Sequence, residues 1–330
     1  MITYSALLIG CGKIAGNTKE AGVDTHAGAL CSQNKIILSS CVDLDFDRAV
    51  KFAERYGCQA HGNVRSALLN NKFDVISICT SDKSHFILAK EILTNINSPK
   101  VLFLEKPACR TRNEFHELKI LAKKANVLIL VNHTRRFSQN FAKLRSLIQK
   151  KQFGELYQVN ATYYGGWFHN GTHMVDTLNY MLNDIIHFEE IRGCIPCKKK
   201  DDPSLEFKGH LKGQSSKVIF SVIDDSIYQL FDLDLWFEHG RLRIENFGKR
   251  IIWEMMIINA LGERVLVPDK LDLPNEDKSE MQNAYMFISD FLRSREDKHL
   301  NHISLEALEP TMEMLWQGES LNYKKNNHEA

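Results

Sequence analysis

The first third of the chain alternates short apolar runs with longer amphipathic stretches. The apolar runs end at Ile9, Val42, Ile78, Leu104 and Val131, and a weaker one covers Gln59–His61. Short apolar runs separated by helical patterns are typical of β–α–β units that build a parallel sheet. The pattern therefore predicts an α/β domain with six parallel strands over residues 1–131.

The pattern changes after residue 131. Turn residues recur at short intervals through 205–268, which predicts consecutive strands, and closely spaced turns favour antiparallel pairing. Other segments predict a strand over 156–164 and helices over 172–182, 279–295 and 304–320. Residues 132–330 are therefore expected to form a second, α+β domain with one large open, mainly antiparallel sheet.

A glycine-rich turn follows the first apolar run without a gap, as Gly10-Cys11-Gly12-Lys13-Ile14-Ala15. In such a turn the first glycine bends the chain, and the second lets the backbone approach a pyrophosphate. The small Ala15 lets a following helix pack close to the strand, with the phosphate on the helix N-terminus. We expect Gly10, Gly12, Lys13 and Ile14 to contact a dinucleotide.

An acidic residue closes the second apolar run, at Asp43. At that strand end a carboxylate accepts hydrogen bonds from the adenosine ribose and disfavours a 2′-phosphate. A polar stretch over residues 16–25 lengthens the connection, so Asp43 lies farther from the glycines than the usual spacing of about 20 residues. The expected cofactor is therefore NAD rather than NADP.

Charge and composition exclude several classes of protein. Lysine and arginine number 42 against 41 acidic residues, so no overall field recruits nucleic acid or an anionic membrane. No run approaches the roughly 18 apolar residues that span a bilayer. The eight scattered cysteines and the absence of a basic leader at residue 1 favour a cytoplasmic protein with reduced thiols.

Seven short segments follow one another in the chain: Gly10–Ala15, His26–Leu30, Val42-Asp43, Thr80–His85, Glu105-Lys106-Pro107, Arg135-Arg136-Phe137 and Gly165–Asp176. Together they resemble the motifs of the Gfo/Idh/MocA family, named after glucose–fructose oxidoreductase and inositol dehydrogenase. The resemblance covers essentially the whole chain. It implies a Rossmann domain over 1–131 and a substrate-binding and oligomerisation domain over 132–330. It also implies hydride transfer between NAD and a secondary alcohol, in a homodimer or homotetramer.

The resemblance assigns roles to individual residues. It implies that Lys106 and His173 are catalytic, and that Thr80, Ser81, His85 and Glu105 contact the cofactor with Lys106. The family's acid two residues before the second-motif glycine is His169 here. His169 or Asn170 is expected to replace that acid, with His169 as a possible second base. The substrate-binding set is completed by Arg136, Trp167 and Asp176.

The chemistry of these side chains suits alcohol oxidation. Lys106 follows a parallel strand, so its ammonium would hold the hydroxyl oxygen at the edge where ligands meet such sheets. Histidine as a residue type ordinarily titrates near neutral pH, so His173 suits the base that the hydroxyl proton requires. Asn170 is expected to cap the helix that carries His173 and Asp176 on one face. Trp167 would stack on a sugar ring or nicotinamide, or fill the core.

Two other function classes remain open. His169 and His173 stand four apart, but a zinc site needs three or four ligands and no Glu completes an HExxH pattern, so no metal is expected. A metal-dependent hydrolase or lyase is the weaker alternative. A non-catalytic NAD-binding regulator, as in the galactose-regulon repressor of the same family, is the stronger one. The preferred prediction is an NAD-dependent dehydrogenase or ketoreductase of a hexose, inositol or nucleotide-linked sugar.

Overall fold

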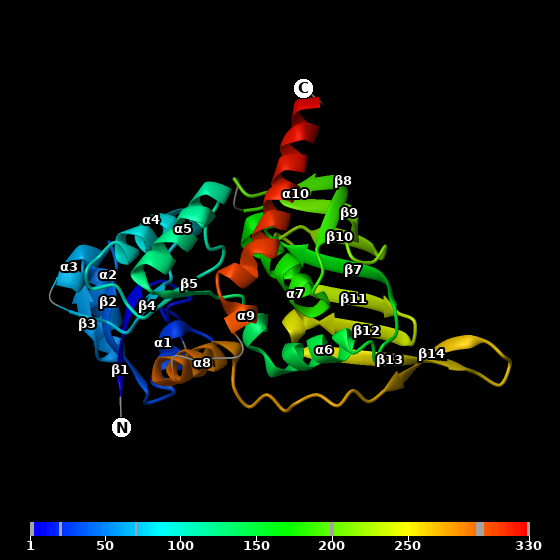
Figure 1. Ribbon diagram of the computed structural model, residues 1–330, viewed down its shortest axis with the longest axis horizontal. Helices are drawn as coiled ribbons and strands as arrows, with labels where there is room; N and C mark the ends of the chain where they lie inside the picture. The colour runs from blue at the N-terminus through cyan, green and yellow to red at the C-terminus, as the bar shows by residue number, and fades with distance from the viewer. Residues whose placement is uncertain (1–2, 20–21, 70, 199–200, 295–299, 329–330) are drawn as a thin grey trace. The chain divides into compact units, whose positions relative to one another are not determined.

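The computed structural model describes residues 3–19, 22–69, 71–198, 201–294 and 300–328. The chain divides into two compact units (Figure 1). Unit 1 comprises Met1–Ser138 and Glu276–Leu308, and unit 2 comprises Gln139–Asn275 and Glu309–Ala330. Each unit contains one sheet, of six and eight strands respectively. The predicted fold class is confirmed.

The sheet of unit 1 has the strand order β3-β2-β1-β4-β5-β6, and all its pairs are parallel. Its strands are β1 (Tyr4–Ile9), β2 (Ile36–Val42), β3 (Gln59–His61), β4 (Val75–Ile78), β5 (Val101–Leu104) and β6 (Leu128–Val131). The order reverses between β1 and β4, which makes their carboxyl ends the place where a ligand meets such a sheet.

Helices connect these strands at the positions that the sequence pattern predicts. They are α1 (His26–Cys31), α2 (Phe46–Tyr56), α3 (Val64–Leu69), α4 (Asp82–Leu93) and α5 (Arg112–Ala125). The start of α5 is fixed by a capping box, in which Thr111 accepts from the Glu114 N–H and the Glu114 carboxylate accepts from the Thr111 N–H. Asn126 ends the helix in a left-handed conformation.

The boundary between the units differs from the predicted division at residue 131. Unit 1 continues through η1 (Thr134–Phe137) and regains α8 (Glu280–Ser294), α9 (Leu300–Ile303) and η4 (Glu306–Leu308). The reason is the apolar face of α8: Met281, Ala284, Tyr285 and Ile288 are at most 2% exposed within the unit 1 core. A single boundary in the sequence cannot describe a unit that is built from two separate segments of the chain.

The sheet of unit 2 has the order β14-β13-β12-β11-β7-β10-β9-β8 and is mainly antiparallel. Its strands are β7 (Leu156–Tyr164), β8 (Ile186–Ile195), β9 (Ser204–Leu211), β10 (Lys217–Ile223), β11 (Asp232–Phe237), β12 (Gly240–Glu245), β13 (Arg250–Ile258) and β14 (Arg264–Asp269). One pair, β7 with β10, is parallel, because β7 comes from a separate part of the chain and enters the middle of the sheet.

Strand β8 was not predicted. Register shifts between Phe188 and Glu190, and between Ile191 and Gly193, break the alternation of buried and exposed positions that identifies a strand. The predicted helix over 304–320 was also wrong at its start. The long helix α10 runs from Glu309 to His328, because Pro310 is tolerated only in the first turn of a helix.

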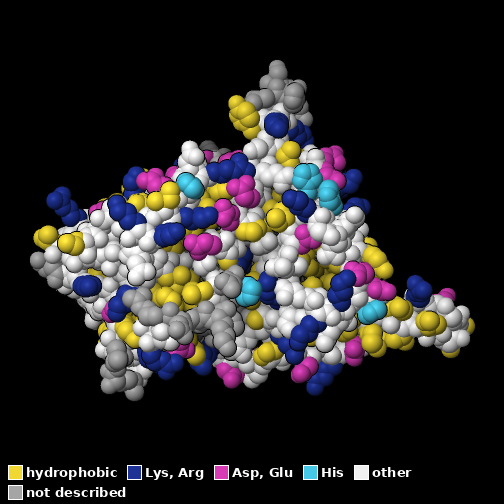
Figure 2. All heavy atoms as spheres, in the orientation of Figure 1, with side chains coloured by type: hydrophobic (Ala, Val, Ile, Leu, Met, Phe, Trp, Pro, Cys, Tyr) yellow, Lys and Arg dark blue, Asp and Glu magenta, His cyan; other side chains and the backbone are white. Residues whose placement is uncertain are grey.

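Unit 2 also contains the helices α6 (Gln139–Gln149), α7 (Thr172–Leu182) and α10 (Figure 1). The core between α7, α10 and the sheet is aromatic: Trp167 packs with its ring centroid 4.8 Å from that of Phe207 and 5.5 Å from that of Phe188. The indole N–H of Trp167 donates to the Leu315 carbonyl at 2.9 Å. On the face that Figure 2 shows, the described lysines, arginines and acidic residues are interspersed.

A substitution in α8 tests its place in the core of unit 1. Ile288→Ala removes a side chain that is 0% exposed, and the cavity should destabilise the protein by about 2–5 kcal/mol. Ile87→Ala, at a position that is 66% exposed, should change stability by less than about 0.5 kcal/mol. Urea unfolding followed by circular dichroism measures both. Equal small effects would contradict the assignment of α8 to this core.

Candidate functional site

The glycine turn between β1 and α1 requires its first glycine. Gly10 has φ +91°, and a Cβ there would lie 2.8 Å from Thr80 Cγ2 and 3.0 Å from the Cys79 carbonyl. Its N–H donates to the Val42 carbonyl at 2.8 Å. The turn is therefore held against the ends of β2 and β4 at a distance that only glycine allows.

The second glycine faces open space. A Cβ at Gly12 would meet nothing within 4 Å. Among the described residues, no acceptor is assigned to the N–H groups of Gly12, Lys13 and Ile14, and the Lys13 and Ile14 side chains are exposed. Backbone N–H groups around a glycine concavity suit a pyrophosphate. These residues fit the phosphates of a dinucleotide.

A pocket of about 800 Å³ opens beside this turn. The residues that line it come from the carboxyl ends of β1, β2 and β4 and from the helices that follow. They include Gly10, Gly12, Asp43, Arg48, Asn63, Arg65, Thr80 and Ser81. The volume and position suit the adenosine half of a dinucleotide, which meets an open parallel sheet at this edge.

The glycine turn does not lead directly into a helix. Residues 12–16 form turns, in which Gly16 N donates to the Gly12 and Lys13 carbonyls, and α1 begins only at His26. The N-terminus of α1 is closed by Thr25, whose hydroxyl accepts from Gly28 N. The phosphates would therefore meet the N–H groups of the turn rather than a helix N-terminus.

Asp43 lies at the end of β2 and is 9% exposed. One carboxylate oxygen accepts from Cys11 N at 2.8 Å and Arg48 Nε at 3.0 Å; the other accepts from Asp45 N at 3.0 Å and Arg48 Nη2 at 2.9 Å. Burial acts to raise the pKa of Asp43, but the bonds from Arg48, Cys11 and Asp45 outweigh it and hold the pKa below its usual value. The carboxylate is therefore ionised at neutral pH.

Arg48 was missed as a site residue. Its guanidinium donates one hydrogen bond to each oxygen of Asp43. Together with the bonds from Cys11 N and Asp45 N, these make four bonds, which use the acceptor positions of the carboxylate. A ribose hydroxyl can bind Asp43 only by sharing or replacing a bond from Arg48, whose side chain is 45% exposed. The spacing of an acid and an arginine five residues apart at a strand–helix junction is the signal that could have found it.

Two cofactor candidates follow β4. Thr80 and Ser81 line the pocket, as predicted for them. His85 does not: it is 1% exposed, and its ring nitrogens lie 2.8 Å from the Pro107 carbonyl and 3.0 Å from the Thr80 carbonyl. The prediction that His85 contacts the cofactor is corrected. Its ring instead ties the backbone of Glu105-Lys106-Pro107 to the end of β4.

Glu105 and Lys106 follow β5, next to β4 in the sheet. Glu105 is 8% exposed, and its Oε1 accepts from Asn132 Nδ2 at 2.6 Å and lies 3.0 Å from His26 Nε2. Both bonds hold Oε1 of Glu105 inside unit 1. The expectation that this oxygen contacts the cofactor directly is therefore corrected. Lys106 is half-buried beside it.

In unit 2, the predicted catalytic segment is a short π-helix, η2 (Trp167–Gly171), that runs into α7. Its N-terminus is capped by Asp202, which is 1% exposed and accepts from Phe168 N at 2.9 Å and His169 N at 2.8 Å. Gly166 is obligatory, because a Cβ there would lie 2.5 Å from Asp202 Oδ2. Nothing local in the sequence indicated Asp202, since it lies more than 30 residues away.

The predicted cap at Asn170 is wrong, because Asn170 lies inside η2 and α7 begins without a side-chain cap. The continuous helix places His169, Asn170 and His173 on successive turns, with His169 exposed and Asn170 and His173 half-buried. These three polar side chains reach the surface at the start of the helix, and Asn179 does so two turns later.

Three substrate candidates are buried. Trp167 is 1% exposed and belongs to the aromatic core, so it is not available to stack on a ligand. Asp176 is 1% exposed and accepts from Thr311 Oγ1 at 2.9 Å. In unit 1, Arg136 is 7% exposed and donates to the His302 carbonyl. The expected substrate contacts of Trp167, Asp176 and Arg136 are corrected to structural roles.

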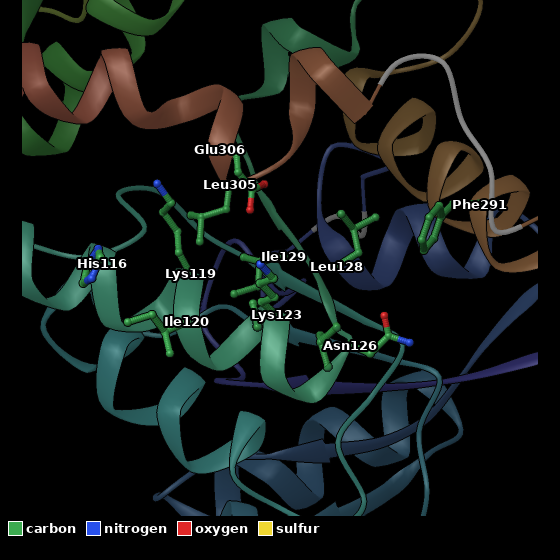
Figure 3. A pocket seen from close by; sticks show the side chains of 12 residues that line it. His116, Lys119, Ile120, Lys123, Asn126, Leu128, Ile129, Phe291, Leu305 and Glu306 are labelled. Atoms are coloured by element: carbon green, nitrogen blue, oxygen red, sulfur yellow. The ribbon is translucent and has the colours of Figure 1, made fainter.

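A second pocket of unit 1, of about 480 Å³, lies along α5, β6 and residues 305–306 (Figure 3). His116, Lys119 and Lys123 line it, and none of the predicted site residues does. Within the described ranges, no group of three or more His, Cys, Asp or Glu side chains is placed to hold a metal ion. The search of those ranges for a helix able to cross a membrane likewise found no candidate.

Residues 4–133 match the family model described as "Oxidoreductase family, NAD-binding Rossmann fold". The chain is 25% identical over 138 residues to myo-inositol 2-dehydrogenase of Thermotoga maritima, a match that covers 42% of this chain and 40% of that protein. The matches to curated relatives thus span less than half of the length of those relatives.

Solved structures share the fold over nearly the whole chain. KijD10, a 3-ketoreductase from Actinomadura kijaniata in complex with NADP, has a TM-score of 0.75 at 13% identity and covers 97% of both chains. The Gal80p super-repressor mutant of Saccharomyces cerevisiae has a TM-score of 0.75 at 16% identity, covering 99% of this chain and 97% of that one. At these identities the likeness shows the fold alone.

A methyl group at the second glycine tests the phosphate contact. Gly12→Ala should fold normally, because its Cβ meets nothing, but should weaken NADH binding about tenfold or more by occupying the space a phosphate needs. Gly22→Ala is the matched control, since it also has room for a methyl group. Isothermal titration calorimetry measures both affinities. Unchanged NADH affinity in Gly12→Ala would contradict the assignment.

Proposed function

We propose that this chain, whose residues 4–133 belong to the Gfo/Idh/MocA family of NAD-binding oxidoreductases, interconverts a secondary alcohol and a ketone on a small polyol or sugar. The observation that carries the proposal is the pocket beside Gly12. It opens at the carboxyl ends of β1, β2 and β4, and Lys106 follows the neighbouring strand β5. With the adenosine half at β2, a dinucleotide extends toward β4 and β5.

The bound dinucleotide supplies the hydride acceptor or donor. Lys106 lies where the sheet's edge continues beyond β4, so its ammonium is assigned to the substrate oxygen that changes between hydroxyl and carbonyl. A cation there stabilises negative charge that develops on this oxygen. Glu105 beside it keeps the local charge balanced, since the charge of Lys106 contributes to holding the pKa of Glu105 low.

His173 is assigned the proton of that hydroxyl. It is half-buried on the first turn of α7. Asp202 accepts hydrogen bonds from the start of η2 and thereby holds the segment that carries His173. In alcohol oxidation its imidazole accepts the proton as hydride leaves the carbon, and in reduction it returns the proton. His169 and Asn170, on the preceding turn, are assigned to hydrogen bonds with neighbouring substrate hydroxyls.

The substrate class follows from the polar character of these groups and from the relatives. An imidazole, an amide and an ammonium suit a molecule with several hydroxyl groups. Myo-inositol 2-dehydrogenase and the 3-ketoreductase KijD10 are similar proteins that support a cyclic polyol or a sugar, free or nucleotide-linked. The proposed cofactor is NAD, because residues 4–133 match an NAD-binding family and an ionised Asp43 at the end of β2 would repel a 2′-phosphate.

A non-catalytic NAD-binding sensor is the second candidate. His169 stands where the family has an acid, and the fold is shared with Gal80p, described as a repressor. Absorbance at 340 nm discriminates the two functions. Oxidation or reduction of the nicotinamide with any member of a panel of inositols, hexoses and nucleotide sugars supports an enzyme, whereas NADH binding without redox change supports a sensor.

Substitution of the two assigned catalytic residues tests the mechanism. Lys106→Ala and His173→Ala should each bind NADH like the wild type but lose turnover by about 10²-fold or more, because each removes a group that acts in the transition state. Lys123→Ala, in the second pocket, is the matched control and should keep full turnover. Wild-type turnover in either active-site variant would remove that residue from the mechanism.

A further inference from the structure

A chain of hydrogen bonds crosses the interior of unit 1 and ends at Glu105. Ser77 Oγ lies 2.8 Å from the Tyr285 hydroxyl, which lies 2.7 Å from His26 Nδ1. His26 Nε2 lies 3.0 Å from Glu105 Oε1. The Ser77, Tyr285 and His26 side chains are each 0% exposed. The mechanism proposed above uses none of these three residues.

The chemistry of the groups fixes the direction of the bond to Glu105. An ionised carboxylate only accepts, so His26 Nε2 donates to Glu105. With a neutral imidazole the Tyr285 hydroxyl donates to Nδ1 and Ser77 donates to the Tyr285 oxygen; with an imidazolium both of these bonds reverse. In both cases the Ser77, Tyr285 and His26 side chains all have partners. We name Ser77, Tyr285 and His26 the relay.

Aromatic packing holds the relay in one geometry. The His26 ring meets the Tyr285 and Phe103 rings edge to face, with centroid distances of 5.8 and 5.3 Å. Phe103 and Tyr285 are in turn 5.6 Å apart. Four elements contribute, because Ser77 lies on β4, Tyr285 on α8, His26 on α1 and Phe103 on β5. The relay therefore joins the returning helix α8 to the motif after β5.

The charge state of Glu105 depends on this arrangement. Burial acts to raise the pKa of Glu105, but the His26 bond first, then the Asn132 bond and the charge of Lys106, bring it below its usual value. The other titratable groups that face it are Cys79 and Tyr285, whose pKa values burial raises well above their usual ranges, so both stay neutral. His26 is thus the main donor that keeps the buried carboxylate charged.

We propose that the relay is a positioning device that holds Glu105 in one orientation as an anion, at the start of the segment that carries Lys106. The assignment of Lys106 rests on the proposed function, whereas the coupling of the relay to Glu105 does not. Tyr285 connects α8 to Glu105 through His26, although it is assigned no contact with the cofactor or the substrate.

Four substitutions in the full-length chain test the relay. Tyr285→Phe removes only the hydroxyl, His26→Leu removes both ring nitrogens, and His26→Gln restores a side-chain N–H for Glu105. Ser289→Ala is the matched control: Ser289 lies one turn after Tyr285 on α8, is 2% exposed, and donates only to the Met286 carbonyl of the same helix. It removes a buried hydroxyl from α8 without touching the relay.

The first measurement is independent of activity. The urea midpoints of His26→Gln and His26→Leu are compared from pH 8 to pH 3, so that histidine titration at residue 26 is absent from both. A donor to Glu105 lowers its pKa in the folded state below the ordinary value of 4.5, and that stabilisation is present above this value and lost as the pH falls below it. The advantage of the Gln variant should therefore be constant near neutral pH and shrink below about pH 4.5. A constant difference indicates packing alone and overturns the relay.

The second measurement is the pH dependence of kcat/KM with the substrate that the panel identifies. In Tyr285→Phe and His26→Leu the acid limb should move to higher pH, by about one unit in the Leu variant, because Glu105 becomes protonated more easily. His26→Gln should restore most of the wild-type profile, and Ser289→Ala should leave it unchanged. Profiles in all variants that match that of Ser289→Ala would overturn the proposal.

The two failures are distinguishable. A wild type that binds NADH but shows no turnover with any compound of the panel overturns the proposed function, and the urea midpoints still decide whether the relay controls Glu105. A wild type that turns over normally, with a constant Gln–Leu difference in midpoint and unshifted profiles, keeps the proposed function and overturns the relay.

Discussion

The account depends on one steric constraint, the approach of the backbone at Gly10 to the end of β4. A Cβ at this position would lie 2.8 Å from Thr80 Cγ2, so no other residue lets the chain turn there. The same turn donates from Gly10 N to the end of β2 and from Cys11 N to Asp43. Three strand ends are thereby held around Gly12, whose missing side chain leaves room for a phosphate. The pocket and the position of the acid follow from this turn, and Lys106 follows the strand that pairs with β4.

Most of the fold could be predicted from the chain because its patterns are local. The apolar runs of β1 to β6 are short-range signals, and the structure reproduces them. The errors concern long-range contacts. The bulged edge strand β8 lacks a regular alternation, and β7 pairs in parallel with β10 although their sequences indicate only strands. The return of α8 to unit 1 depends on an apolar face whose partner no periodicity can name.

Site residues could be predicted where a short backbone motif determines the chemistry. They could not be predicted where the fold brings together side chains from distant parts of the chain. Gly10, Gly12, Asp43 and Thr80 line the pocket, as their positions after strands implied. Trp167 and His85 carry polar groups that suit ligands, but the nitrogens of both lie against carbonyls inside the protein. Asp202 and Tyr285 were missed because their partners lie more than 30 residues away in the chain. A buried carboxylate such as Glu105 requires donors, and the sequence does not show where those donors come from.

The central claim is that a dinucleotide binds across the edge of the unit 1 sheet, with its pyrophosphate on the N–H groups after Gly10. Calorimetric titration of the folded, full-length protein with NADH, and separately with ADP-ribose, tests it most directly. The account predicts saturable binding of one molecule of each per chain, because both contain the adenosine and the pyrophosphate that the pocket and the turn would hold. The absence of measurable binding of either compound to folded protein would contradict it.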